Sequence, residues 1–278
     1  MNKQDMDILS ILYSERYINQ RELSEKCGHS LGIVNRSLKQ LVNEGYIDEE
    51  FILTDKAKKA FEDAKPKNAI ILAAGFGMRM VPINMEIPKG LLEVNGEPLI
   101  ERTIKQLNKV GIKEIYVVVG FMKENYEYLI DEYGIELIVN KEYASKNNMH
   151  SLSLVSDKIS NTYIIPCDVW CDINPYSKNE LYSWYMVSDM VDDESDVRVN
   201  RKMELVSVVN RNGGNAMIGI SYLLKEDAKK VVKRMEILCG DRRNDGMFWE
   251  EALYQNKEMI VKAKVVPSAD VVEINTYE

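Results

Sequence analysis

Histidine is almost absent from this chain, and cysteine is sparse. The 278 residues contain two histidines and four cysteines, and no two cysteines have the C-x-x-C spacing. This pattern predicts neither a disulfide framework nor a zinc site, and it indicates a reduced, cytoplasmic protein. The two histidines, His29 and His150, supply no Ser-His-Asp arrangement. Chemistry that depends on a histidine base is therefore not indicated.

Long apolar runs and an excess of positive charge are also absent. No stretch approaches the length of a membrane span, and the N-terminal residues MNKQDMDILS do not resemble a signal peptide. We therefore expect no membrane association. A net charge of −8 argues against a general binder of polyanions. The hydrophobic fraction of 45% is sufficient for a proper core, and the length allows one large domain or two smaller ones.

The stretch from residue 68 to residue 94 is the most informative part of the sequence. Residues 69–73 are apolar without alternation, which predicts a parallel strand covered on both faces. Gly75 and Gly77 follow, and glycines allow the backbone to bend sharply and approach a ligand with its amides free. Two cations and two prolines come next, in the order Arg79, Pro82, Pro88 and Lys89. A buried strand, a glycine turn and two spaced cations predict a receptor for a polyphosphate.

This glycine turn is neither of the two common types. Met80 stands where G-x-G-x-x-G requires its third glycine, and the G-K-[ST] ending of a P-loop is missing. The stretch resembles the signature of nucleotidyltransferases that activate phosphorylated sugars and alcohols, L-A-A-G-x-G-x-R-[LM]-x-P…P-K-x-L. The matching residues are Leu72, Ala73, Ala74, Gly75, Gly77, Arg79, Met80, Pro82, Pro88, Lys89 and Leu91.

The resemblance implies attack of a substrate phosphate on the α-phosphorus of a nucleoside triphosphate, with release of pyrophosphate. A phosphomonoester is close to its dianion at neutral pH, so this reaction needs charge neutralisation and alignment rather than a general base. In the family pattern, Arg79 holds the β- and γ-phosphates, and Lys89 holds the α-phosphate and the acceptor phosphate. The implied nucleotide-binding set is Leu72, Ala73, Ala74, Gly75, Gly77, Arg79, Lys89, Gly120 and Asn147.

Residues 1–65 are predicted to form a small unit of their own. Apolar residues at helical spacing predict four helices, with Asn19, Ser30 and Thr54 as N-caps and Gly28 as a stop. Residues 46–53 are predicted to form a tight hairpin. Helices followed by a two-stranded wing resemble a winged helix-turn-helix domain of the kind found in many bacterial regulators.

DNA binding does not follow from this resemblance. Residues 1–65 contain ten basic and twelve acidic residues, a net charge of −2. The candidate recognition helix offers Arg36 and Lys39, and the wing tip is Asp48-Glu49-Glu50, which phosphates would repel. A docking or dimerising role is favoured, and a homodimer is one expectation.

Residues 66–278 are predicted to form one doubly wound α/β domain with a Rossmann-like, mostly parallel mixed sheet. Strands expected at 114–119, 136–139 and 162–167 alternate with helices expected at 98–110 and 123–133. Further strands are expected at 185–191, 204–209 and 216–222. The Lys65-Pro66-Lys67 stretch is the predicted boundary between this domain and the unit before it.

Asp168 directly follows the strand expected at 162–167. Ligands in open α/β sheets bind outside the carboxyl ends of the strands. A lone Asp at this place is often a turn residue, but together with the signature it favours a Mg²⁺ ligand. The resemblance adds Glu273 and Asn275, from a closing E-[IV]-[DN] motif, and the neutral Asn275 is a weaker ligand than a carboxylate.

Two later stretches resemble the acceptor side of bacterial CTP:phosphocholine cytidylyltransferases. They are Y-A-x-x-N-N-x-x-S-L at 143–152 and F-W-E at 248–250, with V-G-F-x-K-E at 119–124 as further support. A quaternary ammonium requires aromatic faces and a nearby carboxylate. The implied acceptor residues are Asn148, Ser151, Tyr222, Phe248, Trp249 and Glu250. An ordinary helix cap for Asn147 or Asn148 and a core position for Trp249 remain alternatives.

The acceptor itself is not determined by these motifs. His150 and residues 195–199 occupy places where the resemblance leads us to expect aromatic residues. Phosphoethanolamine, 2-aminoethylphosphonate, a polyol phosphate and a sugar 1-phosphate therefore remain alternatives to phosphocholine. The chain stops three residues after Asn275, where relatives usually continue into a helix and some carry a choline-kinase-like domain, so a shortened C-terminus is expected. The alternative from another class is a transcription regulator with an α/β ligand sensor.

Overall fold

The computed structural model describes residues 1–77, 86–193, 195, 197–207, 213–254 and 259–274. The chain divides into two compact units. One comprises Met1–Lys65 together with Asn179–Tyr182, and the other comprises Pro66–Lys178 and Ser183–Glu278. Within the described residues, no helix is long and apolar enough to cross a membrane.

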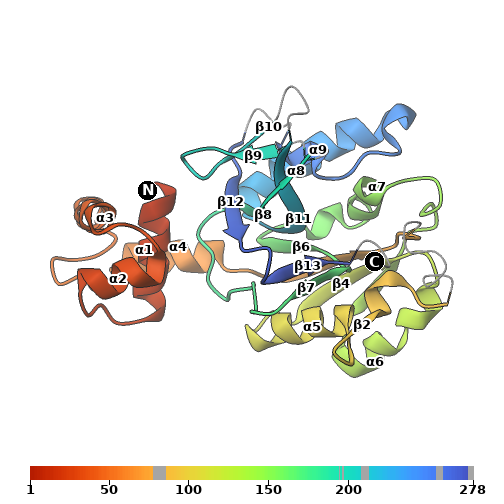
Figure 1. The fold of residues 1–278 in the computed structure, drawn as a ribbon, viewed down its shortest axis with the longest axis horizontal. Helices are drawn as coiled ribbons and strands as arrows, with labels where there is room; N and C mark the ends of the chain where they lie inside the picture. The colour runs from red at the N-terminus through yellow and green to blue at the C-terminus, as the bar shows by residue number, and fades with distance from the viewer. Residues whose placement is uncertain (78–85, 194, 196, 208–212, 255–258, 275–278) are drawn as a thin grey trace. The chain divides into compact units, whose positions relative to one another are not determined.

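The first unit consists of four helices and a minimal wing (Figure 1). The helices are α1 (Lys3–Ser14), α2 (Gln20–Cys27), α3 (Leu31–Asn43) and α4 (Asp55–Ala64). The predicted hairpin is an isolated bridge between Ile47 and Leu53, and the Asp48 side chain accepts hydrogen bonds from Glu50 N (3.0 Å) and Ile52 N (2.8 Å). This is the helix-and-wing arrangement that the sequence predicted.

The predicted helix caps are confirmed at two of three places. Asn19 Oδ1 accepts hydrogen bonds from Arg21 N and Glu22 N, both at 3.0 Å, and Thr54 Oγ1 accepts one from Ala57 N at 3.4 Å. Gly28 ends α2 with φ +67°, a left-handed conformation that favours glycine. The prediction for Ser30 was wrong in its detail, because Ser30 precedes α3 without a capping bond from its side chain among the described contacts.

The second unit is built on a seven-stranded mixed sheet with the order β12-β8-β11-β6-β1-β4-β5. The strands are β1 (Asn68–Ala73), β4 (Glu114–Val119), β5 (Glu136–Val139), β6 (Thr162–Pro166), β8 (Trp184–Asp192), β11 (Gly214–Leu223) and β12 (Lys262–Val266). Every described neighbouring pair is parallel except the two that involve β11, which is antiparallel to both β6 and β8. The predicted mostly parallel α/β architecture is therefore confirmed.

Helices cover both faces of this sheet (Figure 1). On one face, α7 (Asn148–Ser153), α8 (Lys225–Cys239) and α9 (Glu251–Tyr254) share a buried core with β1, β4, β6 and β8. On the other face lies α5 (Leu99–Lys109), whose Leu99, Ile100, Ile104 and Leu107 are fully buried. Because both faces are covered, the central strands have no polar side, as their apolar sequences required.

Three small ribbons and several short helices complete the second unit. The ribbons pair β2 (Glu93–Val94) with β3 (Glu97–Pro98), β7 (Val169–Cys171) with β13 (Val271–Glu273), and β9 (Val197–Val199) with β10 (Leu205–Ser207). The helix expected at 123–133 is split into the 3₁₀ turn η4 (Lys123–Tyr126) and α6 (Tyr128–Tyr133). Other 3₁₀ turns are η3 (Lys89–Leu91), η5 (Ser156–Lys158) and η6 (Arg242–Asn244). Sequence analysis did not predict β7, β9 or β12. Of these, β7 and β12 pair with segments distant in the chain, whereas β9 has three residues and pairs with the nearby β10.

Candidate active site

A cavity of about 790 Å³ lies outside the carboxyl ends of β1 and β6. The turn after β1 contributes Ala74, Gly75, Phe76 and Gly77, and the end of β6 contributes Pro166, Cys167 and Asp168. The opposite wall is the segment that enters α7, residues 143–148, with Ser151 and Phe248. Sequence reasoning predicted a ligand site at this edge of the sheet.

The glycine turn brings backbone close to the cavity. Leu72, Ala74, Gly75 and Gly77 line it, and Gly77 has φ +65°. Ala73 is buried behind the lining. Arg79, which the signature assigns to the phosphates, lies outside the described residues, together with Met80 and Pro82.

Gly120 acts on the cavity indirectly, because it allows the Tyr143 segment to approach β1. A Cβ atom at Gly120 would lie 2.6 Å from Tyr143 Cβ and 2.9 Å from Ala74 O. Phe121 N donates to the same Ala74 oxygen at 3.2 Å. Any larger residue at position 120 would push the Tyr143 wall away from the glycine turn.

Lys89 and Asp168 form an ion pair inside this cavity. Lys89 begins η3, where Gly90 packs tightly because a Cβ there would lie 3.1 Å from both Cys167 Cβ and the Tyr126 hydroxyl. The Lys89 ammonium donates to Asp168 Oδ2, and the two side chains are 11% and 14% exposed. The structure therefore brings together two residues that the sequence assigned to catalysis.

Asp168 also offers an oxygen that suits a metal ion. Its Oδ1 atom is buried and has no hydrogen-bond partner among the described residues. Carboxylate oxygens are the preferred ligands of Mg²⁺, which usually takes one or two of them from the protein. Ile274 N donates to Asp168 O at 2.9 Å, and Glu273 pairs with Val169, so β13 follows Asp168 closely. Asn275 lies outside the described residues, and the described part of the chain contains no group of three acidic, His or Cys side chains placed to hold a metal.

The start of α7 is joined to the 245–249 loop by backbone and amide hydrogen bonds. Asn147 caps α7, with its Oδ1 accepting from Asn148 N at 2.7 Å, and its Nδ2 donates to Gly246 O at 3.0 Å. Asn148 Oδ1 accepts from Trp249 N at 2.8 Å. Ser151 lines the same wall, and its hydroxyl accepts from Asn140 Nδ2 at 3.0 Å. Asn147 is therefore both a helix cap and part of the cavity wall, so the two interpretations of this residue are compatible.

The predicted acceptor aromatics do not all reach the cavity. Phe248 lines it and is 57% exposed. Trp249 is 1% exposed and packs in the core, with its ring centroid 6.3 Å from that of Tyr185. Tyr222 is also fully buried, and its ring lies 5.0 Å from that of Tyr163. On β11 and β8, Tyr222 pairs with Trp184, and the preceding residue Ser221 pairs with Tyr185. The Tyr222 and Tyr185 side chains therefore point to opposite faces of the sheet. The expectation that Tyr222 lines an acceptor pocket with Phe248 is not met.

Glu250 is a buried carboxyl group directly behind the cavity wall. Burial raises the pKa of Glu250 to about 7, although hydrogen bonds from its own backbone, Tyr185 and Asn148 lower it, and the negative charge of Glu273 raises it further. The Tyr185 hydroxyl lies 3.2 Å from Glu250 Oε1, while Oε2 is buried without a partner among the described residues. Asn148 lines the cavity and also hydrogen-bonds to the Glu250 carboxyl group, so this group lies behind the wall.

Phe76, Tyr143 and Lys146 are among the residues of the cavity wall that sequence reasoning missed. Phe76 stacks edge-on against Phe121 at 4.3 Å, and Phe121 lies 6.4 Å from Tyr143. Lys146 pairs with Glu142 at 2.9 Å. Phe76 occupies a variable position of the signature, so the motif gave no signal for it. Tyr143 and Lys146 lie inside the 143–152 segment that carried the resemblance, and this segment could have indicated them.

The cavity thus combines a glycine turn with a cation and a carboxylate at the edge of a mostly parallel sheet. Such an arrangement has the charges that neutralising and aligning phosphates requires, which is typical of the nucleotidyltransferase class. Residues 69–174 match the MobA-like NTP transferase domain family, and residues 1–48 match a winged helix-turn-helix DNA-binding family.

Comparison with known proteins narrows the class. The chain is 30% identical over 215 residues to the choline-phosphate cytidylyltransferase of Streptococcus pneumoniae, covering 76% of this chain and 93% of the relative. It is 32% identical over 209 residues to the 2-aminoethylphosphonate cytidylyltransferase of Lancefieldella rimae, covering 69% and 80%. The chain belongs to the cytidylyltransferase family of which these enzymes are members.

Solved structures agree with this assignment. The CTP:phosphocholine cytidylyltransferase of Streptococcus pneumoniae superposes with a TM-score of 0.71 at 30% identity, covering 76% of this chain and 95% of that one. The inositol-1-phosphate CTP transferase of T. maritima gives a TM-score of 0.62 at 21% identity, covering 77% and 91%, which shows a shared fold.

Proposed function

We propose that this protein transfers a cytidylyl group from CTP to phosphocholine, giving CDP-choline and pyrophosphate. The observation that carries this proposal is the Lys89–Asp168 ion pair beside the glycine turn. The second Asp168 oxygen, Oδ1, is buried without a hydrogen-bond partner among the described residues, and it could bind a metal. A phosphate oxygen of the acceptor attacks the α-phosphorus, and the bond between that phosphorus and the bridging oxygen breaks as pyrophosphate leaves. The acceptor phosphate is already a nucleophile, so the protein needs to align and neutralise rather than to remove a proton.

Each side chain then has a defined task. The Lys89 ammonium stabilises negative charge on the α-phosphate and the acceptor phosphate, and Arg79 binds the β- and γ-phosphates. Amides of the glycine turn approach the nucleotide, which a side chain at Gly75 or Gly77 would obstruct. Asp168, with Glu273 and Asn275, would hold Mg²⁺, which supplies further neutralisation of phosphate oxygens when it is bound.

The assignment of phosphocholine as the acceptor is supported by the cavity wall around Phe248 and by Glu250 behind it. A trimethylammonium group has no hydrogen to donate, and it is stabilised by ring faces and by a carboxylate at short range. Phe248, Tyr143 and Phe76 supply rings to the cavity, and Glu250 supplies a carboxylate behind Asn148.

One observation favours a second acceptor class, a primary amine such as 2-aminoethylphosphonate or phosphoethanolamine. The unpartnered Glu250 Oε2 would suit an N–H donor, which a quaternary ammonium does not have. A relative of this chain is a 2-aminoethylphosphonate cytidylyltransferase.

Competition between acceptors distinguishes the two classes. With CTP fixed, phosphocholine, phosphoethanolamine and 2-aminoethylphosphonate are supplied together, and the three cytidylylated products are separated by mass. We expect CDP-choline to predominate. Predominance of a primary-amine product would reject phosphocholine as the acceptor while keeping cytidylyl transfer.

A further inference from the structure

The metal-side residues lie on a ribbon that is separate from the main sheet. Asp168 leads directly into β7, which pairs antiparallel with β13 over three residue pairs, from Val169–Glu273 to Cys171–Val271. Cys167 N still bonds to Leu72 O of β1 at 3.2 Å, and beyond it β7 has left the seven-stranded sheet. A two-stranded ribbon this short is marginal by itself, so its position depends on what packs against it.

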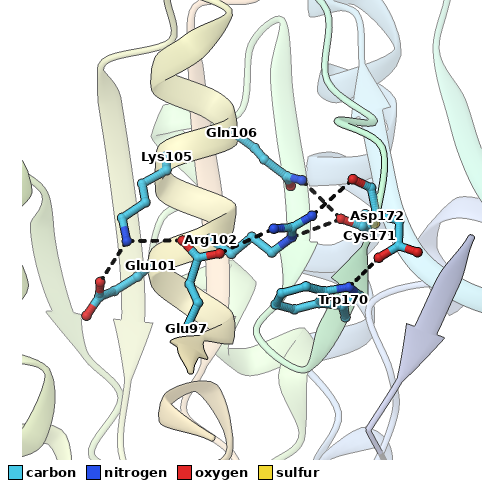
Figure 2. A network of polar contacts seen from close by, with 8 residues as sticks. All are labelled: Glu97, Glu101, Arg102, Lys105, Gln106, Trp170, Cys171 and Asp172. Carbon is cyan, nitrogen blue, oxygen red and sulfur yellow. Dashed lines mark hydrogen bonds and ion pairs between the residues drawn. The ribbon is translucent and has the colours of Figure 1, made fainter. Parts of the chain in front are cut away.

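Helix α5 binds the backbone around the end of β7 through two side chains, Arg102 and Gln106 (Figure 2). Arg102 Nε donates to Cys171 O at 3.0 Å, and its Nη2 donates to Asp172 O, also at 3.0 Å. Gln106, one turn further along α5, donates a second bond to Cys171 O at 3.1 Å. The Arg102 guanidinium lies 3.9 Å from the centre of the Trp170 ring, and Trp170 Nε1 donates to Asp172 Oδ1 at 2.7 Å. A guanidinium holds its donors in a rigid planar fork that fits two successive carbonyls, whereas the donors of an ammonium share one nitrogen on a flexible stem.

Arg102 is itself held in place by a chain of charged groups. Its Nη1 donates to Glu97 Oε2 at 3.2 Å, and Lys105 bridges Glu97 and Glu101 at 3.1 Å each. Glu101 also accepts hydrogen bonds from the first and last residues of α6, Tyr128 at 2.9 Å and Tyr133 at 2.7 Å. The guanidinium is therefore held by Glu97, by the Trp170 ring and by two backbone carbonyls.

We propose that Arg102 is a positioning residue for the reaction, which fixes the β7–β13 ribbon and thereby the placement of Asp168 and Glu273. The inference rests on the proposed function, because it assumes that Asp168 binds the metal. Asp168 O accepts from Ile274 N, so a shift of the ribbon moves both metal-side strands together. Groups that orient metal ligands without touching the metal typically change metal affinity by about 10–100-fold when they are removed.

The test uses the full chain with Arg102→Lys, which keeps the charge but removes the fork. Lys109→Ala is the matched control, because it removes an exposed cation from the same helix. Hydrogen–deuterium exchange is measured on metal-free protein at residues 169–172 and 271–274, and the Mg²⁺ concentration for half-maximal turnover is measured separately. We expect Arg102→Lys to speed exchange in the ribbon and to raise the half-maximal Mg²⁺ concentration about tenfold, with kcat recovering at excess Mg²⁺. Lys109→Ala should match wild type in both measurements.

A second, milder variant keeps the inference testable if Arg102→Lys does not fold. Gln106→Leu removes one donor to Cys171 O and should shift both measurements in the same direction by a smaller factor. Asp168→Ala is measured first. If it shifts the Mg²⁺ dependence, the inference is overturned when Arg102→Lys folds and keeps the wild-type Mg²⁺ dependence. If Asp168→Ala leaves the Mg²⁺ dependence unchanged, the proposed metal role fails, and wild-type exchange of residues 169–172 in Arg102→Lys then overturns the role of Arg102 in holding the ribbon.

Discussion

The Lys89 ammonium donates to the Asp168 carboxylate across 79 positions of sequence, which joins the 3₁₀ turn after the glycine signature to the end of β6. The pair leaves one Asp168 oxygen buried and unpartnered among the described residues. A cation for phosphates and an oxygen for a metal therefore meet at one point of the cavity.

Asp168→Ala should reduce kcat by about 10²–10³-fold while leaving the fold intact, because it removes charge stabilisation that acts mainly in the transition state. The measurement is steady-state pyrophosphate release at saturating CTP and acceptor. Asp157→Ala is the control, since Asp157 is an exposed carboxylate that pairs with Lys158. A near-normal kcat for Asp168→Ala would remove this residue from the mechanism.

Acceptor binding should strengthen as the pH rises through about 7. The pKa of Glu250 is raised to about 7 by burial, so the carboxylate that attracts a cationic acceptor predominates only above that pH. Binding of choline, which has no phosphate to titrate, is measured by calorimetry between pH 6 and pH 8. Glu250→Gln should bind weakly with no pH dependence. Equal pH profiles for the two proteins would contradict a role for Glu250.

The same carboxyl group should also affect stability. A carboxyl with a raised pKa in the folded state stabilises the protein at low pH, and this contribution is lost as pH rises through the folded-state pKa. The shift from 4.5 to about 7 corresponds to on the order of 3 kcal/mol. Thermal unfolding should therefore show Glu250→Gln gaining stability relative to wild type between pH 5 and pH 8. A stability difference that is constant over this range would argue against the raised pKa.

Phe248 and Trp249 are adjacent but should respond differently to truncation. Trp249→Ala empties a core position and should lower the unfolding free energy by about 3–5 kcal/mol. Phe248→Ala removes an exposed ring from the cavity and should lower the acceptor kcat/KM a few-fold to about thirtyfold, with KM for CTP nearly unchanged. Denaturant titration and acceptor kinetics on both variants check this. Unchanged discrimination between phosphocholine and phosphoethanolamine in Phe248→Ala would reject an aromatic wall at this position.

The full chain should bind duplex DNA no more tightly than about 1 μM at physiological salt, because residues 1–65 carry a net charge of −2 and an acidic wing tip. A binding-site selection with gel-shift detection checks this. Nanomolar, sequence-specific binding would restore the alternative that the protein is a transcription regulator.

Much of the site was predictable because it depends on a local sequence motif and on the way parallel strands align their ends. The apolar run of β1 and the glycines after it predicted the glycine turn that lines the cavity. Parallel strands bring their carboxyl ends to one edge of the sheet, which predicted that Asp168 would lie near this turn. The direction in which the Tyr222 side chain points was not predictable, because the C-terminal half of β11 is buried on both faces and burial therefore does not distinguish them. The β7–β13 ribbon escaped prediction because each strand has three residues and the two lie about a hundred positions apart.

The most direct test of the central claim is pyrophosphate release with CTP, UTP, GTP and dTTP, each combined with phosphocholine, phosphoethanolamine, 2-aminoethylphosphonate and sugar 1-phosphates. Cytidylyl transfer to phosphocholine predicts that CTP with phosphocholine has the highest kcat/KM of all combinations and that Mg²⁺ is required. Faster turnover of a sugar 1-phosphate with UTP or dTTP than of phosphocholine with CTP would contradict it.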